Sequence, residues 1–173
     1  MPAGADPCAL VAAEHGPSTV RGMELTPDVA GRYVRLAFEQ MLTVADRLGD
    51  DRVNERPLGR RTNAVAGIVV HCCGVSEFWL GHVGRGREST RAREDEFSTS
   101  ATVSELHDLV AVTLAQVEAD LAAIEAGADS AYAEGRMFLV VPEGDASLVV
   151  HVIEELFQHL GHCELAADAL LGS

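Results

Sequence analysis

Apolar residues recur every three or four positions in four long stretches of the chain, which is the spacing of amphipathic α-helices. The first stretch covers residues 25–50, starts with Thr26 as a candidate N-cap followed by Pro27, and ends at Gly49. This pattern predicts a first long helix. Its predicted inward face consists of Val29, Tyr33, Phe38, Met41, Leu42, Ala45 and Leu48.

Three further helices are predicted downstream. A polar connection leads to the second helix, over residues 62–83, and the fourth helix covers residues 146–171. The third helix, over residues 102–126, opens with Thr102 and Glu105 in the spacing of a capping box. The inward stripe of the second helix consists of Ala64, Ile68, His71, Val75, Phe78 and His82.

Two stretches do not follow the helical pattern. Residues 1–24 contain Pro, Gly and Ala without periodicity and are interpreted as a loose N-terminal leader. The segment RMFLVV, residues 136–141, is apolar, β-branched and too short for a helix, which predicts a short extended segment before the last helix. The sequence therefore predicts an all-α fold, a four-helix bundle in which residues 25–173 form a single domain.

Composition and charge narrow the class of partner. The chain has 173 residues, and no apolar run approaches the roughly 20 residues of a membrane span. The formal net charge is −14, and all 13 basic residues are arginines. Such a surface repels nucleic acid and anionic lipid, so neither is expected as a partner. The N-terminus lacks the pattern of a secretory signal, and a cytoplasmic protein is expected.

The stretch HVIEELFQHLGH, residues 151–162, places ligand-type side chains in the last helix. His151, Glu155 and His159 are four residues apart, and His162 follows three residues later, so the four share an arc of about 80° on one helix face. A carboxylate and an imidazole one turn apart can chelate a divalent cation such as Zn²⁺. The spacing therefore makes a metal site on this face a candidate.

A third ligand must come from another helix, and His71 is the candidate because it lies near the middle of the second helix on its inward stripe. His82 shares that stripe but lies roughly 16 Å further along the axis, so both cannot bind one ion. The alternative is a polar core in which the histidines are hydrogen-bonded and Glu155 pairs with an arginine or points outward. Spacing alone leaves both interpretations open.

The cysteines show neither a disulfide framework nor a C-x-x-C motif, and buried free thiols are expected. Cys72 and Cys73 point away from the side of the helix that carries His71, so both are expected in the core. Cys163 lies one turn beyond His159 and is a further ligand type that zinc accepts.

The stretches TNAVAGIVVHCCGVSEFWLGHV (residues 62–83) and EELFQHLGH (residues 154–162) resemble the DinB/YfiT-like superfamily. The closer resemblance is to its branch of mycothiol-dependent S-transferases and maleylpyruvate isomerases, and it extends over about residues 26–171. The segment RAREDEF before the third helix is similar to the linker of that family. The resemblance implies a divalent metal held by His71, Glu155 and His159, and it argues against Cys163 as a ligand.

The resemblance also implies the reaction. A histidine more often stands where this chain has Glu155, whereas the isomerase-like branch has glutamate there. The full isomerases carry a further C-terminal domain that these 173 residues do not contain, so a thiol S-transferase is expected rather than an isomerase. Three protein ligands leave a fourth position open, at which a metal activates a thiol for attack on a small electrophile. The implied thiol is mycothiol, and a homodimer is expected.

Several roles around the site remain alternatives. Zn²⁺ is the first candidate metal, with Ni²⁺ or Fe²⁺ as others. His151 and His162 either orient the ligands through hydrogen bonds or are hydrogen-bonded core residues. Trp79 either lines a cofactor pocket or packs in the core, and Arg85 either binds the thiol cofactor or belongs to a solvated loop with Arg87, Arg91 and Arg93.

Two other functions fit the same bundle. If water takes the place of the thiol, the site supports a metal-dependent hydrolase or lyase of a specialised pathway. A third class is a non-catalytic dimer that binds a metal or a small ligand. Dependence of turnover on a thiol separates the first two, and absence of turnover indicates the third.

Overall fold

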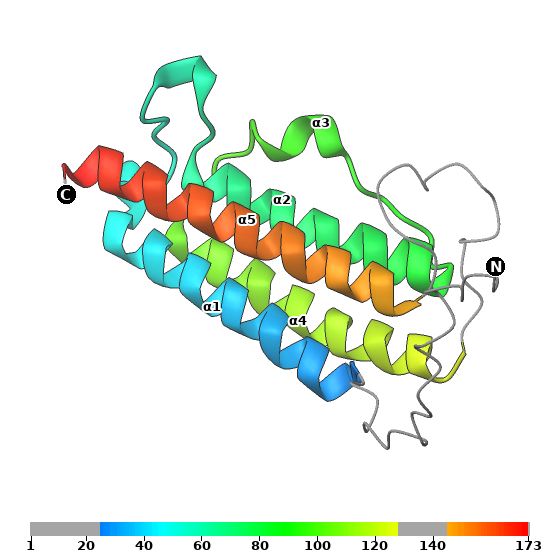
Figure 1. Ribbon diagram of the computed structural model, residues 1–173. Coiled ribbons are helices and arrows are strands. Elements are labelled where there is room, and N and C mark those ends of the chain that lie inside the picture. Colours follow the sequence, from blue (N-terminus) through cyan, green and yellow to red (C-terminus); the bar gives the residue numbers. More distant parts are fainter. Residues whose placement is uncertain (1–24, 128–144, 173) are drawn as a thin grey trace, which may run out of the picture.

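The computed structural model describes residues 25–127 and 145–172, and its long helices form a bundle (Figure 1). They are α1 (Pro27–Arg52), α2 (Val65–Ser76) with its π-helical continuation η2 (Glu77–Val83), α4 (Val103–Glu125) and α5 (Asp145–Leu171). The 3-10 helix η1 (Gly59–Arg61) and the short helix α3 (Arg93–Glu96) lie in the connections. The predicted all-α bundle is confirmed, while the expected leader and the segment 136–141 lie outside the described residues.

The order of the helices around the bundle places α2 and α5 side by side. α1 packs against α4 and α5, and α2 packs against the same two helices from the opposite side. Figure 1 shows that α1 and α5 run in one direction and α2 and α4 in the other. The connection from η2 to α4 must therefore return along the length of the bundle, and it crosses over α2, where it forms α3.

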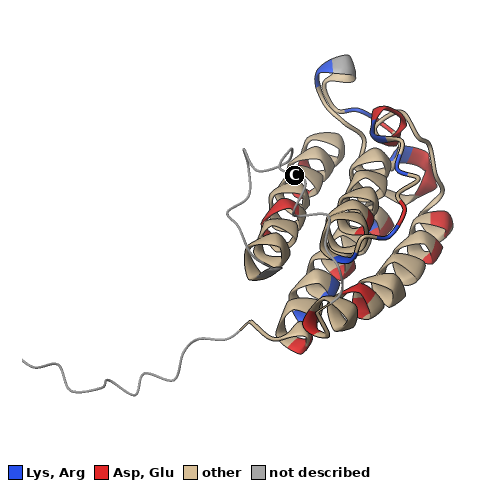
Figure 2. Ribbon diagram, turned by 90° about the vertical axis from the view of Figure 1, so that its right-hand side faces the viewer, with Lys and Arg blue, Asp and Glu red and all other residues tan. Residues whose placement is uncertain are grey.

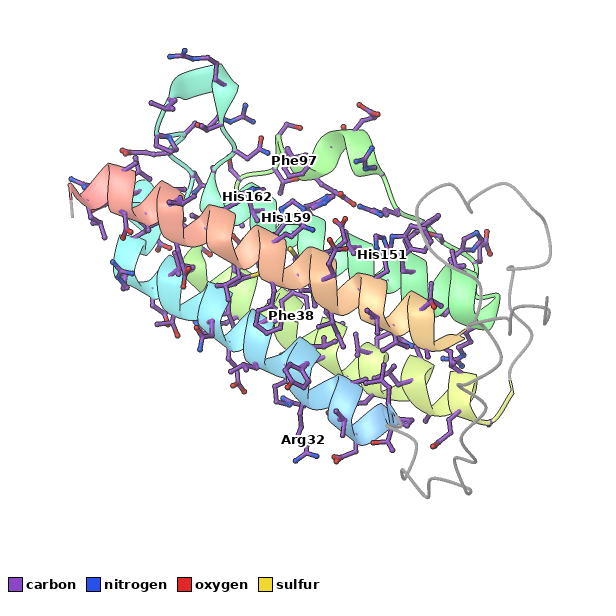
Figure 3. All side chains as sticks on the ribbon, in the orientation of Figure 1. Arg32, Phe38, Phe97, His151, His159 and His162 are labelled. Carbon is purple, nitrogen blue, oxygen red and sulfur yellow. The ribbon has the colours of Figure 1, made fainter. Side chains whose placement is uncertain are left out.

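The core lies between the four helices and is filled by large apolar side chains from each of them. Among the fully buried ones are Phe38, Met41, Leu80, Leu106, Leu148 and Leu156. Phe38 points from α1 into the centre of the bundle (Figure 3). The predicted inward face of α1 is wrong at one position: Tyr33 is 51% exposed, and its ring packs on the outside against Phe157 of α5. Val34 takes the buried position instead.

The helix ends follow the expected capping chemistry. The hydroxyl of Thr26 accepts a hydrogen bond from the amide of Val29, with Pro27 at the first helical position. Thr102 and Glu105 form the reciprocal capping box at the start of α4. Gly49 has a positive φ of 65° and kinks α1 one turn before its end at Arg52. The helical pattern of the sequence predicts a helix end at this residue.

The second predicted helix departs from regular α geometry. It starts at Val65 rather than Thr62, and after Ser76 it widens into η2, where the amide of Gly84 reaches back five residues to the carbonyl of Trp79. Contrary to expectation, the stretch Val65–Val83 is long and apolar enough to span a membrane by length and composition. However, 67% of its apolar window is buried inside the protein, so its composition reflects its place in the core.

Candidate metal centre

The three candidate ligands converge where α2 meets α5. One ligand atom from each of His71, Glu155 and His159 lies within 4.8 Å of the other two. The rings of His71 and His159 meet edge to face with their centroids 4.7 Å apart, and Nε2 of His159 lies 3.6 Å from Oε2 of Glu155. Figure 3 shows His159 on the side of α5 that faces α2, below Phe97. Two imidazoles and one carboxylate are a donor set that suits a divalent metal such as zinc.

A second segment also contacts His71. It is the crossover, the connection between η2 and α4 that contains α3 (residues 84–102). Nδ1 of His71 lies 2.7 Å from Oε2 of Glu96, the last residue of α3, and both side chains are almost fully buried. The guanidinium of Arg91 donates to both oxygens of that carboxylate, at 2.6 and 3.0 Å. Phe97 stacks on the His71 ring with centroids 4.4 Å apart. Because Nδ1 is engaged, Nε2 is the nitrogen that His71 can offer to a metal.

Burial and charge set the protonation of these groups. Burial lowers the pKa of His71 below the ordinary 6.5, although the hydrogen bond and the charge of Glu96 oppose the shift. Burial likewise lowers the pKa of His159, with a further contribution from the neighbouring His71. For Glu96, burial raises the pKa, but the hydrogen bonds from Arg91 and His71 outweigh it and the pKa is lowered. Near neutral pH the site therefore holds neutral imidazoles, whose lone pairs are free for a metal.

A cavity of about 570 Å³ opens beside the centre. His71 and Glu155 form part of its wall, so a small molecule in the cavity has direct access to the candidate metal position. The other lining residues are Val75, Phe78, Trp79, His82, Ser89, Arg91, Arg93 and His151. Figure 2 shows basic residues on connecting segments of the bundle and acidic residues along its helices.

The remaining predicted site residues fall into different environments. Trp79 lines the cavity and packs edge-on against His151, with ring centroids 4.8 Å apart. The Nδ1 atoms of His162 and His159 lie 3.4 Å apart, so His162 touches a candidate ligand. His151 lies 3.4 Å from Glu154, and these two with Glu155 form a second group of close ligand-type atoms. Arg85 instead donates to the buried Asp120 and is not part of the cavity wall.

The cysteines of the described residues are buried, as expected. Cys72 and Cys163 are completely inaccessible, and Cys73 is 6% exposed. Burial raises the pKa of Cys73 and of Cys163 to about 12, and it raises that of Cys72 well above the ordinary range. Among the described residues, the group of converging ligand atoms around His71 consists of His71, Glu155 and His159 and includes no cysteine.

The chain matches a known protein family. The family described as mycothiol S-transferase matches residues 31–170, a range that includes the three candidate ligands and the crossover. The chain belongs to the mycothiol S-transferase family. This family is part of the DinB-like superfamily, as the two motifs predicted. Membership implies that a low-molecular-weight thiol is a substrate. No curated protein and no solved structure matches the chain.

Sequence reasoning missed Glu96 and the pairing of Arg91 with it. The family-like segment RAREDEF contains both residues, but its length and composition predicted only a polar linker. A buried glutamate has no signal of its own in a stretch where two arginines precede three consecutive acidic residues. The one local hint is the pair of glycines that flank His71 on α2, Gly67 and Gly74, because glycines inside a helix often mark a close approach of another segment.

Proposed function

We propose that this member of the mycothiol S-transferase family is a metal-dependent thiol S-transferase that joins mycothiol to a small electrophile. The observation that supports it most directly is the convergence of His71, Glu155 and His159 beside a cavity large enough for a small molecule, with His71 and Glu155 in the cavity wall. A divalent metal bound there would lower the pKa of a thiol, so that the thiolate is present near pH 7. The family match supplies the class of thiol.

The side chains of the cavity suit the two substrates of such a reaction. Phe78 and Trp79 of η2 provide an apolar wall, which shields the reacting carbon from water. Arg93 is exposed at the rim and adds positive charge, which favours an electrophile that carries an anionic group. His151 lines the same cavity near Glu155, which supports the proposal that it accepts the proton released by the thiol.

The transfer step balances without an oxidant or a reductant. The thiol loses its proton, the sulfur lone pair forms a carbon–sulfur bond, and the bond to the leaving group breaks with its electron pair. The leaving group then takes up the released proton. When the electrophile is an activated double bond, the π electrons take up the proton at the neighbouring carbon instead.

Three finer properties belong to the same proposal. Zn²⁺ is the proposed metal because imidazole and carboxylate are among its common ligands, and Ni²⁺ or Fe²⁺ share them. A homodimer and a cytoplasmic location are proposed from the resemblance and from the sequence. Sedimentation velocity of the purified protein tests the dimer directly.

Metal content and thiol-dependent turnover together test the function. We expect about one divalent metal per chain by mass spectrometry in the wild type and none in the Glu155→Ala/His159→Ala variant, because two of three ligands are removed. Conjugation of mycothiol to a chromogenic electrophile should fall to the uncatalysed rate in that variant. The matched control is His107→Ala, since His107 is an exposed histidine that pairs with Asp46 on the outside of the bundle.

The possible results separate the three functions. Metal with turnover that requires the thiol supports the proposal. Metal with turnover in water alone, without dependence on a thiol, makes the protein a hydrolase or lyase. Metal without turnover of any tested electrophile favours a binding protein, and a folded wild type without metal after incubation with Zn²⁺, Ni²⁺ or Fe²⁺ contradicts the metal site.

A further inference from the structure

We propose that Glu96, held by Arg91, is a positioning residue that keeps the proton of His71 on Nδ1 and so presents Nε2 to the metal. The inference deepens the proposed function and rests on it for the metal, whereas the position of the proton is a property of the metal-free protein. Glu96 and Arg91 lie outside the three-residue ligand set of α2 and α5.

The contact between Glu96 and His71 fixes the direction of the hydrogen bond. An ionised carboxylate only accepts hydrogen bonds, so the 2.7 Å contact requires that Nδ1 of His71 carries the proton and donates it. A neutral imidazole has one such proton, and its second nitrogen then keeps a free lone pair. The side chains of His71 and Glu96 are 5% and 7% exposed, which leaves little room for water to replace this partner.

Arg91 fixes the carboxylate in turn. Its Nε donates to Oε1 at 2.6 Å and its Nη2 donates to Oε2 at 3.0 Å, which is the two-pronged geometry that holds a carboxylate in one orientation. The guanidinium lies over the ring of Phe78, 5.7 Å from its centroid. Glu96 therefore cannot turn away from His71 without breaking both contacts to Arg91.

Two glycines on α2 make room for this arrangement. A Cβ at Gly74 would lie 2.2 Å from Oε1 of Glu96 and 3.1 Å from Nε of Arg91. A Cβ at Gly67 would lie 3.2 Å from Cα of Phe97. Residues 67, 71 and 74 share one face of the helix, so the crossover approaches closely on both sides of His71. Each glycine costs the helix up to about 1 kcal/mol relative to alanine, which this close approach explains.

A metal-free measurement tests the first half of the inference. In protein labelled with ¹⁵N-histidine, at mildly alkaline pH, His71 should show the tautomer with the proton on Nδ1. The Arg91→Met/Glu96→Leu variant removes the acceptor without leaving an unpaired buried charge, and its His71 should become a mixture of tautomers. The matched control makes the same change at the exposed Asp28–Arg32 pair of α1, Asp28→Leu/Arg32→Met, and should leave the His71 signals unchanged.

Metal affinity tests the second half. Competition with a chromophoric chelator should show Zn²⁺ bound about 10- to 100-fold more weakly by the Arg91→Met/Glu96→Leu variant than by the wild type. Gly74→Ala should weaken binding in the same direction, because it displaces the carboxylate without changing the charge. Its control is Gly31→Ala, where a new Cβ makes only an ordinary contact, 3.8 Å from Leu121.

The outcomes separate this inference from the proposed function. A wild-type His71 with its proton on Nε2, or a variant that is folded by circular dichroism and binds Zn²⁺ as tightly as the wild type, overturns it. If the double variant does not fold, Gly74→Ala decides. If the wild type binds no metal, the proposed function fails, and the tautomer measurement alone then decides whether Glu96 positions His71.

Discussion

His71 connects the core of the bundle with the candidate metal centre. One nitrogen meets the buried Glu96 from the crossover, and the other side of the ring faces His159 of α5. The ring is also stacked on Phe97, so its contacts come from two segments that are far apart in the sequence, the crossover and α5. Such contacts reduce the entropy that a ligand loses when it binds a metal, which favours a tight site.

At the residue scale, the cysteines give a prediction that is independent of any metal. Cys72, Cys73 and Cys163 are buried with raised pKa values, about 12 for the latter two, so almost no thiolate is present at pH 8. We expect peptide mapping after iodoacetamide treatment to find all three unmodified in the native protein and modified in denaturant. Ser104→Cys, at an exposed position of α4, should react in the native protein and is the positive control. Rapid native modification of Cys163 would contradict its place in the core.

That the three candidate ligands lie close together could be predicted from the sequence, because it depends on spacing within helices. Glu155 and His159 are one turn apart, and the inward side of His71 follows from the apolar residues around it. Glu96 could not be predicted in the same way, because its contact with His71 spans 25 positions and depends on how the crossover folds. Arg85 and Arg91 look alike in the sequence, yet one pairs with Asp120 and the other with Glu96.

At the scale of the elements, η2 is the feature that simple periodicity does not predict. A π-helix adds a residue to the turn and rotates the side chains that follow, so positions on a regular helix do not describe where the side chains of η2 point. Phe78 and His82, which share the predicted stripe, line the same cavity as Trp79, which lies outside that stripe. The prediction that Tyr33 of α1 faces inward fails for a different reason. A tyrosine is amphipathic, so its ring can pack on the outer surface as well as in the core.

Asp120 of α4 anchors the segment that follows η2, and its replacement should destabilise the protein. The carboxylate is buried and accepts hydrogen bonds from Arg85 at 2.8 Å, Arg87 at 3.2 Å and Gln116 at 2.9 Å. We expect Asp120→Asn to lower the free energy of unfolding by about 2 kcal/mol, less than for a fully buried pair because both arginines are partly exposed. Urea denaturation measures the change.

The control for Asp120 lies on the same helix. Glu118→Gln removes an exposed ion pair with Arg35, which should change the free energy of unfolding by less than about 1 kcal/mol. Equal effects of the two substitutions would show that Asp120 does not anchor the segment after η2.

At the scale of the whole molecule, the crossover couples the site to the fold. Because α2 and α4 run in the same direction, the chain between them has to return over α2, and that return path delivers Arg91 and Glu96 to His71. In a bundle whose consecutive helices are all antiparallel and joined by short loops, no connecting segment would lie over α2 beside His71. The topology therefore supplies the partner of His71, which explains why the helices alone could be predicted and their connection to the site could not.

The same coupling predicts that residues 25–173 unfold as one unit. Trp79, the single tryptophan of the chain, lies in η2 and reports on the site through its fluorescence, whereas far-ultraviolet circular dichroism reports on all helices. In urea the two transitions should coincide.

Two substitutions test this prediction. Phe38→Ala removes a fully buried ring from the core. It should lower the free energy of unfolding by the same amount in both measurements, about 3–5 kcal/mol, although Phe38 belongs to another helix than Trp79. Val112→Ala, at a position that is 70% exposed, should shift neither transition. A fluorescence transition at lower urea than the circular dichroism transition would mean that η2 and the cavity open separately from the bundle, and the single-domain prediction would then be wrong.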